Sequence, residues 1–326
     1  MNSTGRIFRI GLFGESHGSG IGVTIDGCPP GIPLTPEDFN EDLGRRKAGK
    51  KGTTPRIEDD LPEIISGQFN GHTTGAPLTI MFRNRNVRSE DYTNLQETPR
   101  PGHADFVAWK RFKGFNDYRG GGHFSGRLTL CLVAAGVVAK KLISPVTIKA
   151  ALISAGGQKD IEKAVSAALD EGDSIGGVVE CRAAGIPLGW GEPFFDSVES
   201  VIAHLAFSIP AIKGVEFGSG FSASAMKGSA HNDPILDDTG RTATNNAGGI
   251  SGGLTNGNEL VYRIAVKPTS SISVSQSTFS TKSGRVEELK VKGRHDACIA
   301  LRVPVVMEAI TSIALADLKM LAESRS

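Results

Sequence analysis

Residues 128–143 read LTLCLVAAGVVAKKLI, and the ten residues Leu130–Ala139 within this stretch are all apolar. Leucine and alanine favour helix, and a helix that is apolar on nearly every side has to be buried. Ser144-Pro145 ends the pattern, since proline cannot continue a helix. The stretch therefore predicts a buried core helix. At about ten residues, the apolar run is shorter than the roughly 20 needed to cross a membrane.

Shorter patterned segments lie on both sides of this helix. We expect strands at Ile7–Phe13, Gly22–Ile25, Leu78–Phe82, Val146–Ala155, Gly177–Ala183 and Leu260–Val266. We expect further helices from Thr35, as N-cap, to about Arg46, and at Asp160–Asp170, Ser197–Ser208 and Val305–Glu323. Strands and helices are mixed without a regular βαβ alternation, which favours an α+β fold over a Rossmann sheet.

Length and composition narrow the class of protein. The 326 residues are 39% hydrophobic, enough for a substantial core, and no linker divides the chain. The net charge of +1 excludes a polyelectrolyte. The four cysteines, Cys28, Cys131, Cys181 and Cys298, form no CxxC pair, and the N-terminus lacks the apolar segment of a signal peptide. We therefore expect a cytoplasmic protein without a zinc site, a disulfide framework or a membrane anchor.

Arginine and glycine are distributed unevenly. Twelve of the 19 arginines lie in residues 1–127, and arginine is suited to planar capture of carboxylate or phosphate. We single out Arg45, Arg46, Arg83, Arg85, Arg88, Arg100, Arg119 and Arg127. Several lie near glycine clusters, where a backbone can turn sharply or approach a ligand. The set predicts a pocket for a small polyanion, and the alternative is ordinary surface charge.

Residues 44–56, GRRKAGKKGTTPR, carry six cations and no acid. We expect a mobile basic loop here. The segment leaves open a polyanion- or RNA-binding protein, which would show salt-sensitive binding without affinity for a specific cofactor. Aromatic residues make up only 6% of the chain, however, and no stacking platform is evident, so we expect no nucleic-acid partner.

Three segments carry a side chain suited to proton transfer. His17 lies in GESHG directly after an expected strand, His103 lies in RPGHAD, and Asp296 lies in GRHD. Either histidine could equally be structural or exposed, and Asp296 could be a base or could simply hold an arginine. Ser16 beside His17 suggests a serine hydrolase, but the order G-x-S-x-G is absent, which disfavours a nucleophilic serine.

Two further segments are suited to binding phosphate. RGGGHFSGR, residues 119–127, precedes the core helix and offers unhindered N–H groups to an anion, although it is not a P-loop. KPTSS, residues 267–271, combines one cation with three hydroxyls after an expected strand.

Taken together and in this order, the motifs resemble the chorismate synthase family. The likeness covers residues 6–320 and rests on FRIGLFGESHGSGIGVTIDGCPPGIPL, GRRKAGKKG, GHTTGAPL, NVRSEDY, RPGHAD, DYRGGGHFSGR, NNAGGISGG, AVKPTSSI and KGRHDACI. It implies a single α+β domain over residues 1–326, built as a β-α-β sandwich of two antiparallel sheets enclosing helices. It also implies a homotetramer.

The resemblance implies a carbon–oxygen lyase that converts 5-enolpyruvylshikimate 3-phosphate (EPSP) into chorismate and phosphate by 1,4-anti elimination. The family requires reduced FMN (FMNH2) without net redox change, and some members use NADPH as the reductant. An Arg-rich pocket agrees with a substrate that carries two carboxylates and a phosphate.

Roles follow from the resemblance residue by residue. Catalysis would fall to His17, His103 and Asp296, with His17 protonating the departing phosphate. Substrate anions would be held by Arg46, Lys51, Arg100, Arg127 and Arg294. FMN would be held by His123, Phe124, Ser125, Pro210, Ala211, Gly252, Lys267, Pro268, Thr269, Ser270, Ser271 and Arg294. The alternative enzyme is a flavin-dependent oxidoreductase using the same pocket, which would consume reduced flavin with each turnover.

Overall fold

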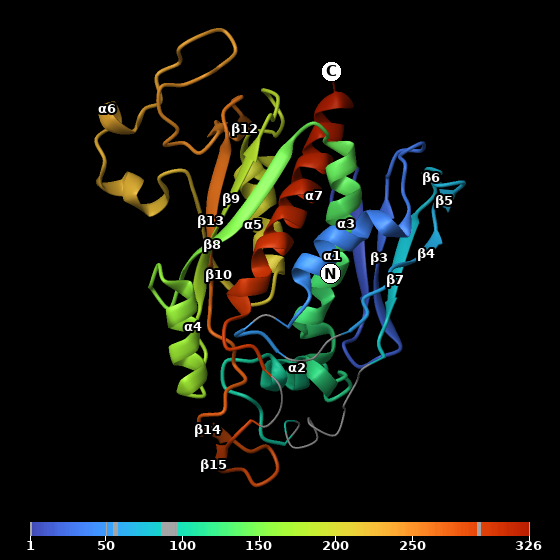
Figure 1. Ribbon diagram of the computed structural model, residues 1–326, viewed down its shortest axis with the longest axis vertical. Helices are drawn as coiled ribbons and strands as arrows, with labels where there is room; N and C mark the ends of the chain where they lie inside the picture. Colours follow the sequence, from blue (N-terminus) through green and yellow to red (C-terminus); the bar gives the residue numbers. More distant parts are fainter. Residues whose placement is uncertain are drawn as a thin grey trace.

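The computed structural model describes residues 2–49, 51–54, 58–85, 95, 97–291 and 295–325. Two antiparallel sheets form its frame (Figure 1). The first contains, in spatial order, β1 (Ser3–Thr4), β2 (Arg9–Gly14), β3 (Gly20–Asp26), β7 (Leu78–Arg83) and β4 (Glu63–Ser66). The second contains β10 (Ile212–Phe217), β13 (Leu260–Val266), β9 (Gly177–Ala184) and β8 (Thr147–Ala155).

Two long helices lie between these sheets, as Figure 1 shows. Helix α3 (Thr129–Leu142) contacts β3 and β7 of the first sheet, and α7 (Val303–Glu323) contacts β8 and β9 of the second. The two helices also pack on each other. A Cβ added at Gly136 would lie 2.4 Å from the Cβ of Ala309, so the helices approach closely where α3 has no side chain.

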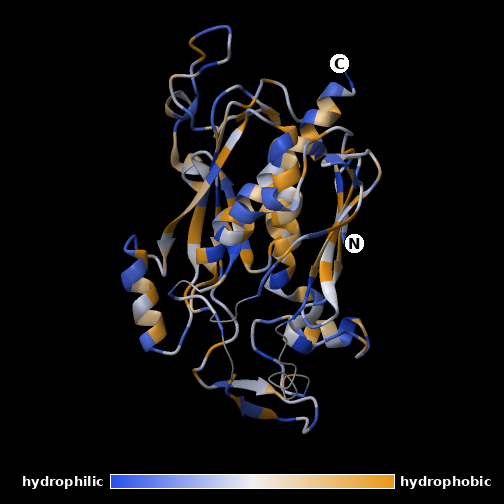
Figure 2. Cartoon of the chain, turned by 45° about the vertical axis from the view of Figure 1, so that its right-hand side comes forward, coloured by the Kyte–Doolittle hydropathy of each residue, from blue (hydrophilic) through white to orange (hydrophobic). Residues whose placement is uncertain are grey.

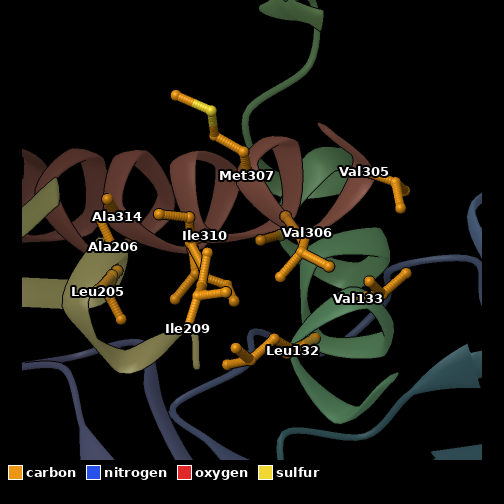
Figure 3. Packing of buried hydrophobic residues seen from close by; sticks show 14 of the residues in the cluster. Leu132, Val133, Leu205, Ala206, Ile209, Val305, Val306, Met307, Ile310 and Ala314 are labelled. Carbon is orange, nitrogen blue, oxygen red and sulfur yellow. The ribbon is translucent and has the colours of Figure 1, made fainter. Parts of the chain in front are cut away.

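One large cluster of buried apolar side chains joins both sheets and the helices. In Figure 3, Leu132 and Val133 of α3 face Val306 and Ile310 of α7, with Leu205 of α5 (Val198–Ser208) nearby. Figure 2 shows apolar colour concentrated on the strands and central helices, whereas the loops are mostly polar. Because these side chains are fully or nearly fully buried, the core positions the loops that emerge from it.

The remaining elements are short. The helices are α1 (Asn40–Arg46), α2 (Asp105–Arg111), α4 (Ile161–Asp170) and α6 (Gly228–His231). The two-stranded ribbons are β5 (Gln68–Phe69) with β6 (His72–Thr73), β11 (Ile250–Ser251) with β12 (Leu254–Thr255), and β14 (Gln276–Phe279) with β15 (Val286–Leu289). Short 3₁₀ segments are η1 (Pro36–Phe39), η3 (Arg119–Phe124), η4 (Gly126–Leu128), η5 (Phe194–Asp196), η6 (Gly220–Ala225) and η7 (Ile299–Arg302).

The α+β class predicted from the sequence agrees with this mixture of helices and antiparallel sheets. The expected strand Leu260–Val266 is β13 itself, and α7 begins two residues before the expected Val305. Thr35 is the predicted N-cap, and its backbone N–H donates to Asp38 Oδ2 at 2.7 Å. The first turn after it is 3₁₀ rather than α, so the α-helix proper starts only at Asn40.

One expectation needs correction. The basic segment does not begin as a loop, because 44–46 form the last turn of α1; Lys50 and residues 55–57 lie outside the described residues.

Two helices are long and apolar enough to be tested as membrane spans. By length and composition, Arg119–Leu142 and Ile299–Glu323 could each cross a bilayer, although the apolar run within the former is short. Their apolar windows are 72% and 78% buried inside the protein, as core helices are.

Candidate active site

A cavity of about 580 Å³ lies where loops from both sheets meet the start of α7. Its walls come from the 100–104 turn, the 120–127 turn, residues 208–211, the 267–271 loop and residues 295–306. Among the described residues, the charged side chains that line it are the cations Arg46, Lys47, Arg100, Arg127, Lys267 and Arg302 and the acids Glu58, Asp60 and Asp296. With six cations against three acids in the described lining, the cavity is suited to a polyanionic ligand.

Arg127 is held in the cavity wall by hydrogen bonds from two of its side-chain nitrogens. Its Nε donates to Asn84 Oδ1 at 2.7 Å and its Nη1 to Asp60 Oδ1 at 2.9 Å. Its Nη2 is buried and has no hydrogen-bond partner among the described residues. A buried, unpartnered donor is costly unless a ligand satisfies it. Arg127 is therefore a preorganised donor for an anion.

Arg46 and Arg302 add two more cations beside it. Arg46 is 3% exposed and donates from Nη2 to the carbonyls of Gly126 and Arg127 at 2.9 and 3.2 Å. Burial, followed by the nearby Arg302 and Arg127, lowers the pKa of Arg46 to about 9. The group still carries its charge near neutral pH, but the crowding of cations makes an added anion favourable.

Asp296 lies at the same end of the cavity. Its Oδ1 accepts a hydrogen bond from the Thr54 backbone N–H at 2.9 Å, and its Oδ2 lies 3.6 Å from Arg302 Nη1. These contacts orient a carboxylate at the cavity wall, which is the arrangement a proton acceptor requires.

Both predicted catalytic histidines lie next to the glycine-rich turn at 119–124. Gly120, Gly121 and Gly122 have φ of 57°, 81° and 53°, a run that residues with side chains rarely adopt. A Cβ at Gly120 would lie 2.4 Å from His17 Cδ2, and one at Gly121 would lie 3.5 Å from His103 Nε2. The turn therefore brings together two histidines that are far apart in the sequence.

The two histidines differ in access to the cavity. His103 lines it, whereas His17 is 5% exposed and lies behind Gly120. Ser16, which precedes His17, does line the cavity, and its backbone N–H donates to the Gly122 carbonyl at 3.1 Å. Ser16 lies in a turn between two strands, not in the strand-to-helix turn of a nucleophilic serine.

Arg100 lines the cavity and is held there by hydrogen bonds to two neighbouring residues. Its Nε and Nη2 donate to the two oxygens of Asp105 at 2.8 and 2.9 Å, and its Nη1 donates to Ser271 Oγ at 2.9 Å. The side chain is 7% exposed. Arg100 thus joins the 100–105 turn to the 267–271 loop.

The 267–271 loop offers donors suited to a phosphate. Lys267 Nζ donates to Ser270 Oγ at 2.9 Å and to the Gly102 carbonyl at 3.0 Å. Burial, and then the nearby Lys213, lower the pKa of Lys267. Thr269 Oγ1 is buried and has no hydrogen-bond partner among the described residues. The loop therefore has a cation and an unsatisfied hydroxyl facing a common ligand space.

The other residues expected at a flavin fall partly in this cavity. His123, Phe124, Ser125, Pro210, Ala211 and Pro268 all line it. His123 Nδ1 lies 2.7 Å from the Gly14 carbonyl oxygen, which can only accept, so Nδ1 carries the proton. Ala211 has φ of 78°, a strained conformation for a residue with a side chain, and its carbonyl accepts from Lys267 N–H at 2.9 Å.

Several of the predicted residues that the structure describes lie away from the cavity. Lys51 Nζ donates to Ser166 Oγ on α4, and Gly252 lies in the turn between β11 and β12. Arg294, Arg88 and the NVRSEDY motif lie outside the described residues. Four of the other arginines singled out from the sequence form ion pairs away from the cavity lining, namely Arg45 with Glu308, Arg83 with Glu63, Arg85 with Asp59 and Arg119 with Asp117.

Sequence reasoning missed four residues that organise the cavity, namely Asp60, Asn84, Asp105 and Arg302. One signal was available for Asp105, because it follows His103 by two residues and could have been considered as its partner. Asp60 and Asn84 are 67 and 43 residues from Arg127 and meet it only through the fold.

Comparisons with known proteins agree on one family. The family model described as chorismate synthase matches residues 8–320. The chain is 65% identical to the chorismate synthase of Chitinophaga pinensis over 100% of this chain and 98% of that protein. It is 46% identical to the chorismate synthase of a Dehalococcoides mccartyi strain, over 98% of this chain and 96% of that protein. A solved structure described as chorismate synthase superposes with a TM-score of 0.75 and 26% identity, covering 98% of this chain and 93% of that chain.

Proposed function

The chain belongs to the chorismate synthase family, and from this premise we propose how its cavity carries out the reaction of that family. That reaction converts EPSP into chorismate and phosphate by a carbon–oxygen lyase elimination. The C3–O bond to phosphate and one C6–H bond break, a second ring double bond forms, and no net oxidation occurs. The family generally uses reduced flavin.

We propose that substrate anions bind at the cluster of Arg46, Arg127 and Arg302. EPSP carries two carboxylates and a phosphate, which matches a cavity with more cations than acids. The buried Nη2 of Arg127, which has no hydrogen-bond partner in the part of the chain that the structure describes, is the single observation that carries this proposal, because a ligand oxygen would satisfy it. Cations near a departing phosphate also stabilise the charge that develops on it.

Reduced FMN fits the neighbouring part of the cavity. Lys267, Thr269 and Ser270 would hold its phosphate, and the unsatisfied Thr269 Oγ1 supports this placement. Pro210, Ala211 and the 123–125 segment would hold its ring system. Bound there, reduced flavin would supply electron density for the elimination without net redox change.

The proton steps are proposed for three side chains. His17 donates a proton to the departing phosphate oxygen from its position behind Gly120. Asp296 assists removal of the C6 proton with the carboxylate that Thr54 N–H orients. His103 carries a proton at the flavin end of the cavity.

The direct experiment is an anaerobic assay with chemically reduced FMN and EPSP. We expect chorismate and phosphate in equal amounts and no net loss of reduced flavin. Folded protein that forms no chorismate would contradict the proposal. Stoichiometric consumption of reduced flavin would instead indicate the alternative, a flavin-dependent oxidoreductase.

Further properties are proposed from family membership. We propose a single domain with the β-α-β sandwich of the family, a homotetramer and a cytoplasmic location. Light scattering of the purified chain tests the tetramer. NADPH as the source of electrons for FMN is tested by anaerobic flavin bleaching with NADPH and no added reductase. Bleaching that equals the protein-free rate would contradict it.

A further inference from the structure

His103 is held by a buried carboxylate. Its Nδ1 lies 2.6 Å from Asp105 Oδ1, and the side chain of Asp105 is 8% exposed. A carboxylate that is ionised can only accept a hydrogen bond. The short contact therefore requires the proton to be on Nδ1 of the imidazole.

Asp105 is kept in the ionised state by its surroundings. Burial alone would raise its pKa, but the hydrogen bonds from Arg100 and His103 outweigh burial and hold the pKa of Asp105 well below its usual range. Arg100 supplies Nε and its backbone N–H to Oδ2, at 2.8 and 3.1 Å. The carboxylate is thus fixed in both charge and orientation.

Arg100 does not compete for the ring nitrogens of His103. Its Nη2 lies 3.0 Å from Nδ1 and 3.2 Å from Nε2. The in-plane directions at these two nitrogens diverge, so one atom at nearly equal distance from both lies over the face of the ring. Nη2 instead donates to Asp105 Oδ1 at 2.9 Å.

The opposite edge of the ring faces the cavity wall. A Cβ at Gly121 would lie 3.5 Å from both Cε1 and Nε2 of His103. His103 itself lines the cavity, as does Gly120 of the same turn. With Nδ1 committed to Asp105, Nε2 is the nitrogen that can meet a ligand.

We propose that Asp105 is a positioning residue of this site, which fixes His103 as the Nδ1-protonated tautomer and presents Nε2 to the ligand in the cavity. The consequence for turnover rests on the proposed function, whereas the tautomer itself does not. Arg100, expected to hold substrate, accordingly serves to fix this carboxylate.

The test is a nitrogen-15 NMR spectrum of the full-length chain labelled at histidine, recorded above the pH at which imidazole titrates. The His103 signals are assigned by their loss in His103→Gln. We expect neutral His103 to carry its proton on Nδ1 in the wild type. A proton on Nε2 would overturn the proposal, and this result needs no variant to fold.

Variants connect the tautomer to turnover. In Asp105→Asn the amide can donate as well as accept, so we expect the uniform Nδ1–H signal to be lost. We expect kcat for chorismate formation to fall about 10²–10⁴-fold, the range for a positioned acid or base, with a smaller change in KM. Asp105→Glu should recover part of both readouts. Asp237→Asn, which removes an exposed carboxylate paired with Arg241 four residues away, should change neither.

The outcomes separate the two proposals. Wild-type tautomer and kcat retained in Asp105→Asn would overturn the positioning role. A wild-type chain that shows the Nδ1 tautomer but forms no chorismate would contradict the proposed function and leave the assignment of Asp105 standing.

Discussion

His17 and His103 lie beside consecutive residues of one turn, because a Cβ added at Gly120 would lie 2.4 Å from His17 Cδ2 and one added at Gly121 would lie 3.5 Å from His103 Nε2. The two histidines lie 86 residues apart in the sequence. A turn with three successive glycines at positive φ leaves room for both rings. The backbone of this turn, and not the segments that carry the two histidines, thus determines how far apart their rings lie.

This relationship predicts that Gly120→Ala impairs turnover. The new Cβ would lie 2.4 Å from His17 Cδ2 and must displace the ring or the turn. We expect chorismate formation to fall about 10²-fold or more, as when a positioned acid is lost. Gly71→Ala is the matched control, since Gly71 has φ of 73° and nothing within 4 Å of an added Cβ. Equal activity losses in the two variants would indicate general backbone strain and contradict a specific effect on His17.

Arg127→Lys tests the anion site. A lysine has no planar fork and cannot reach Asn84, Asp60 and a ligand at the same time. We expect KM for EPSP to rise about 10–100-fold, since losing a charge-assisted hydrogen bond costs about 1.5–3 kcal/mol. Steady-state kinetics at saturating reduced FMN measures this. Arg182→Lys, at an exposed ion pair with Glu180 and Glu259, is the control, and an unchanged KM in Arg127→Lys would remove Arg127 from substrate binding.

We expect Asp317, which lies far from the cavity, to stabilise the fold. It is 5% exposed within α7, and its carboxylate accepts the backbone N–H groups of Arg6, Ile7 and Phe8 at 2.8, 2.7 and 2.9 Å. Asp317→Ala would leave three donors unsatisfied, so we expect a loss of about 3 kcal/mol or more in the free energy of unfolding, measured in urea. Asp196→Asn removes only an exposed ion pair with the Arg6 side chain and should cost less than about 1 kcal/mol. Similar losses in both would refute the role assigned to Asp317.

We expect Glu308 to stabilise the fold, and we expect this contribution to be lost at acid pH. Burial would raise its pKa, but hydrogen bonds from Arg45 and from Ala150 N–H outweigh burial and lower it from the ordinary value of 4.5. Its folded pKa is below its unfolded pKa, so its contribution is present above 4.5 and is lost as pH falls through the folded value. Glu308→Gln should cost about 1.5–3 kcal/mol near neutral pH, because Arg45 loses a charged hydrogen-bond partner but is itself partly exposed and stays paired with Asp42.

The pH dependence distinguishes this charge effect from simple packing. Urea unfolding of wild type and Glu308→Gln should show a difference that shrinks as pH falls below 4.5. A difference independent of pH would mean that side-chain packing, not ionisation, causes the loss.

The regular core elements were predictable because local pattern and burial agree there. The apolar stretch 128–143 contains α3, and the run Leu260–Val266 is β13. Strand β10 was missed because Gly214 interrupts it and its register with β13 shifts between Ile212 and Gly214. Helix α2 was missed because it has seven residues and buries only Ala108, so it lacks an apolar stripe.

The kinds of side chain in the candidate site could be predicted from the sequence, but the residues that each arginine contacts could not. Arginine beside glycine correctly indicated Arg46 and Arg127, which line the cavity, but equally indicated Arg45 and Arg119, which do not. What separates them is the partner each meets in the fold. Arg45 reaches Glu308 in α7, whereas Arg127 reaches Asp60 and retains a buried nitrogen without a partner among the described residues. Contacts across such sequence distances leave no local pattern.

The central claim is that one cavity holds both reduced flavin and EPSP. The most direct measurement is a crystal structure of the full-length chain soaked with FMN and EPSP. We predict an EPSP carboxylate or phosphate oxygen on Arg127 Nη2, and the FMN phosphate on the 267–271 loop. Density for either molecule at a separate site, or none in this cavity at saturating concentrations, would contradict the account.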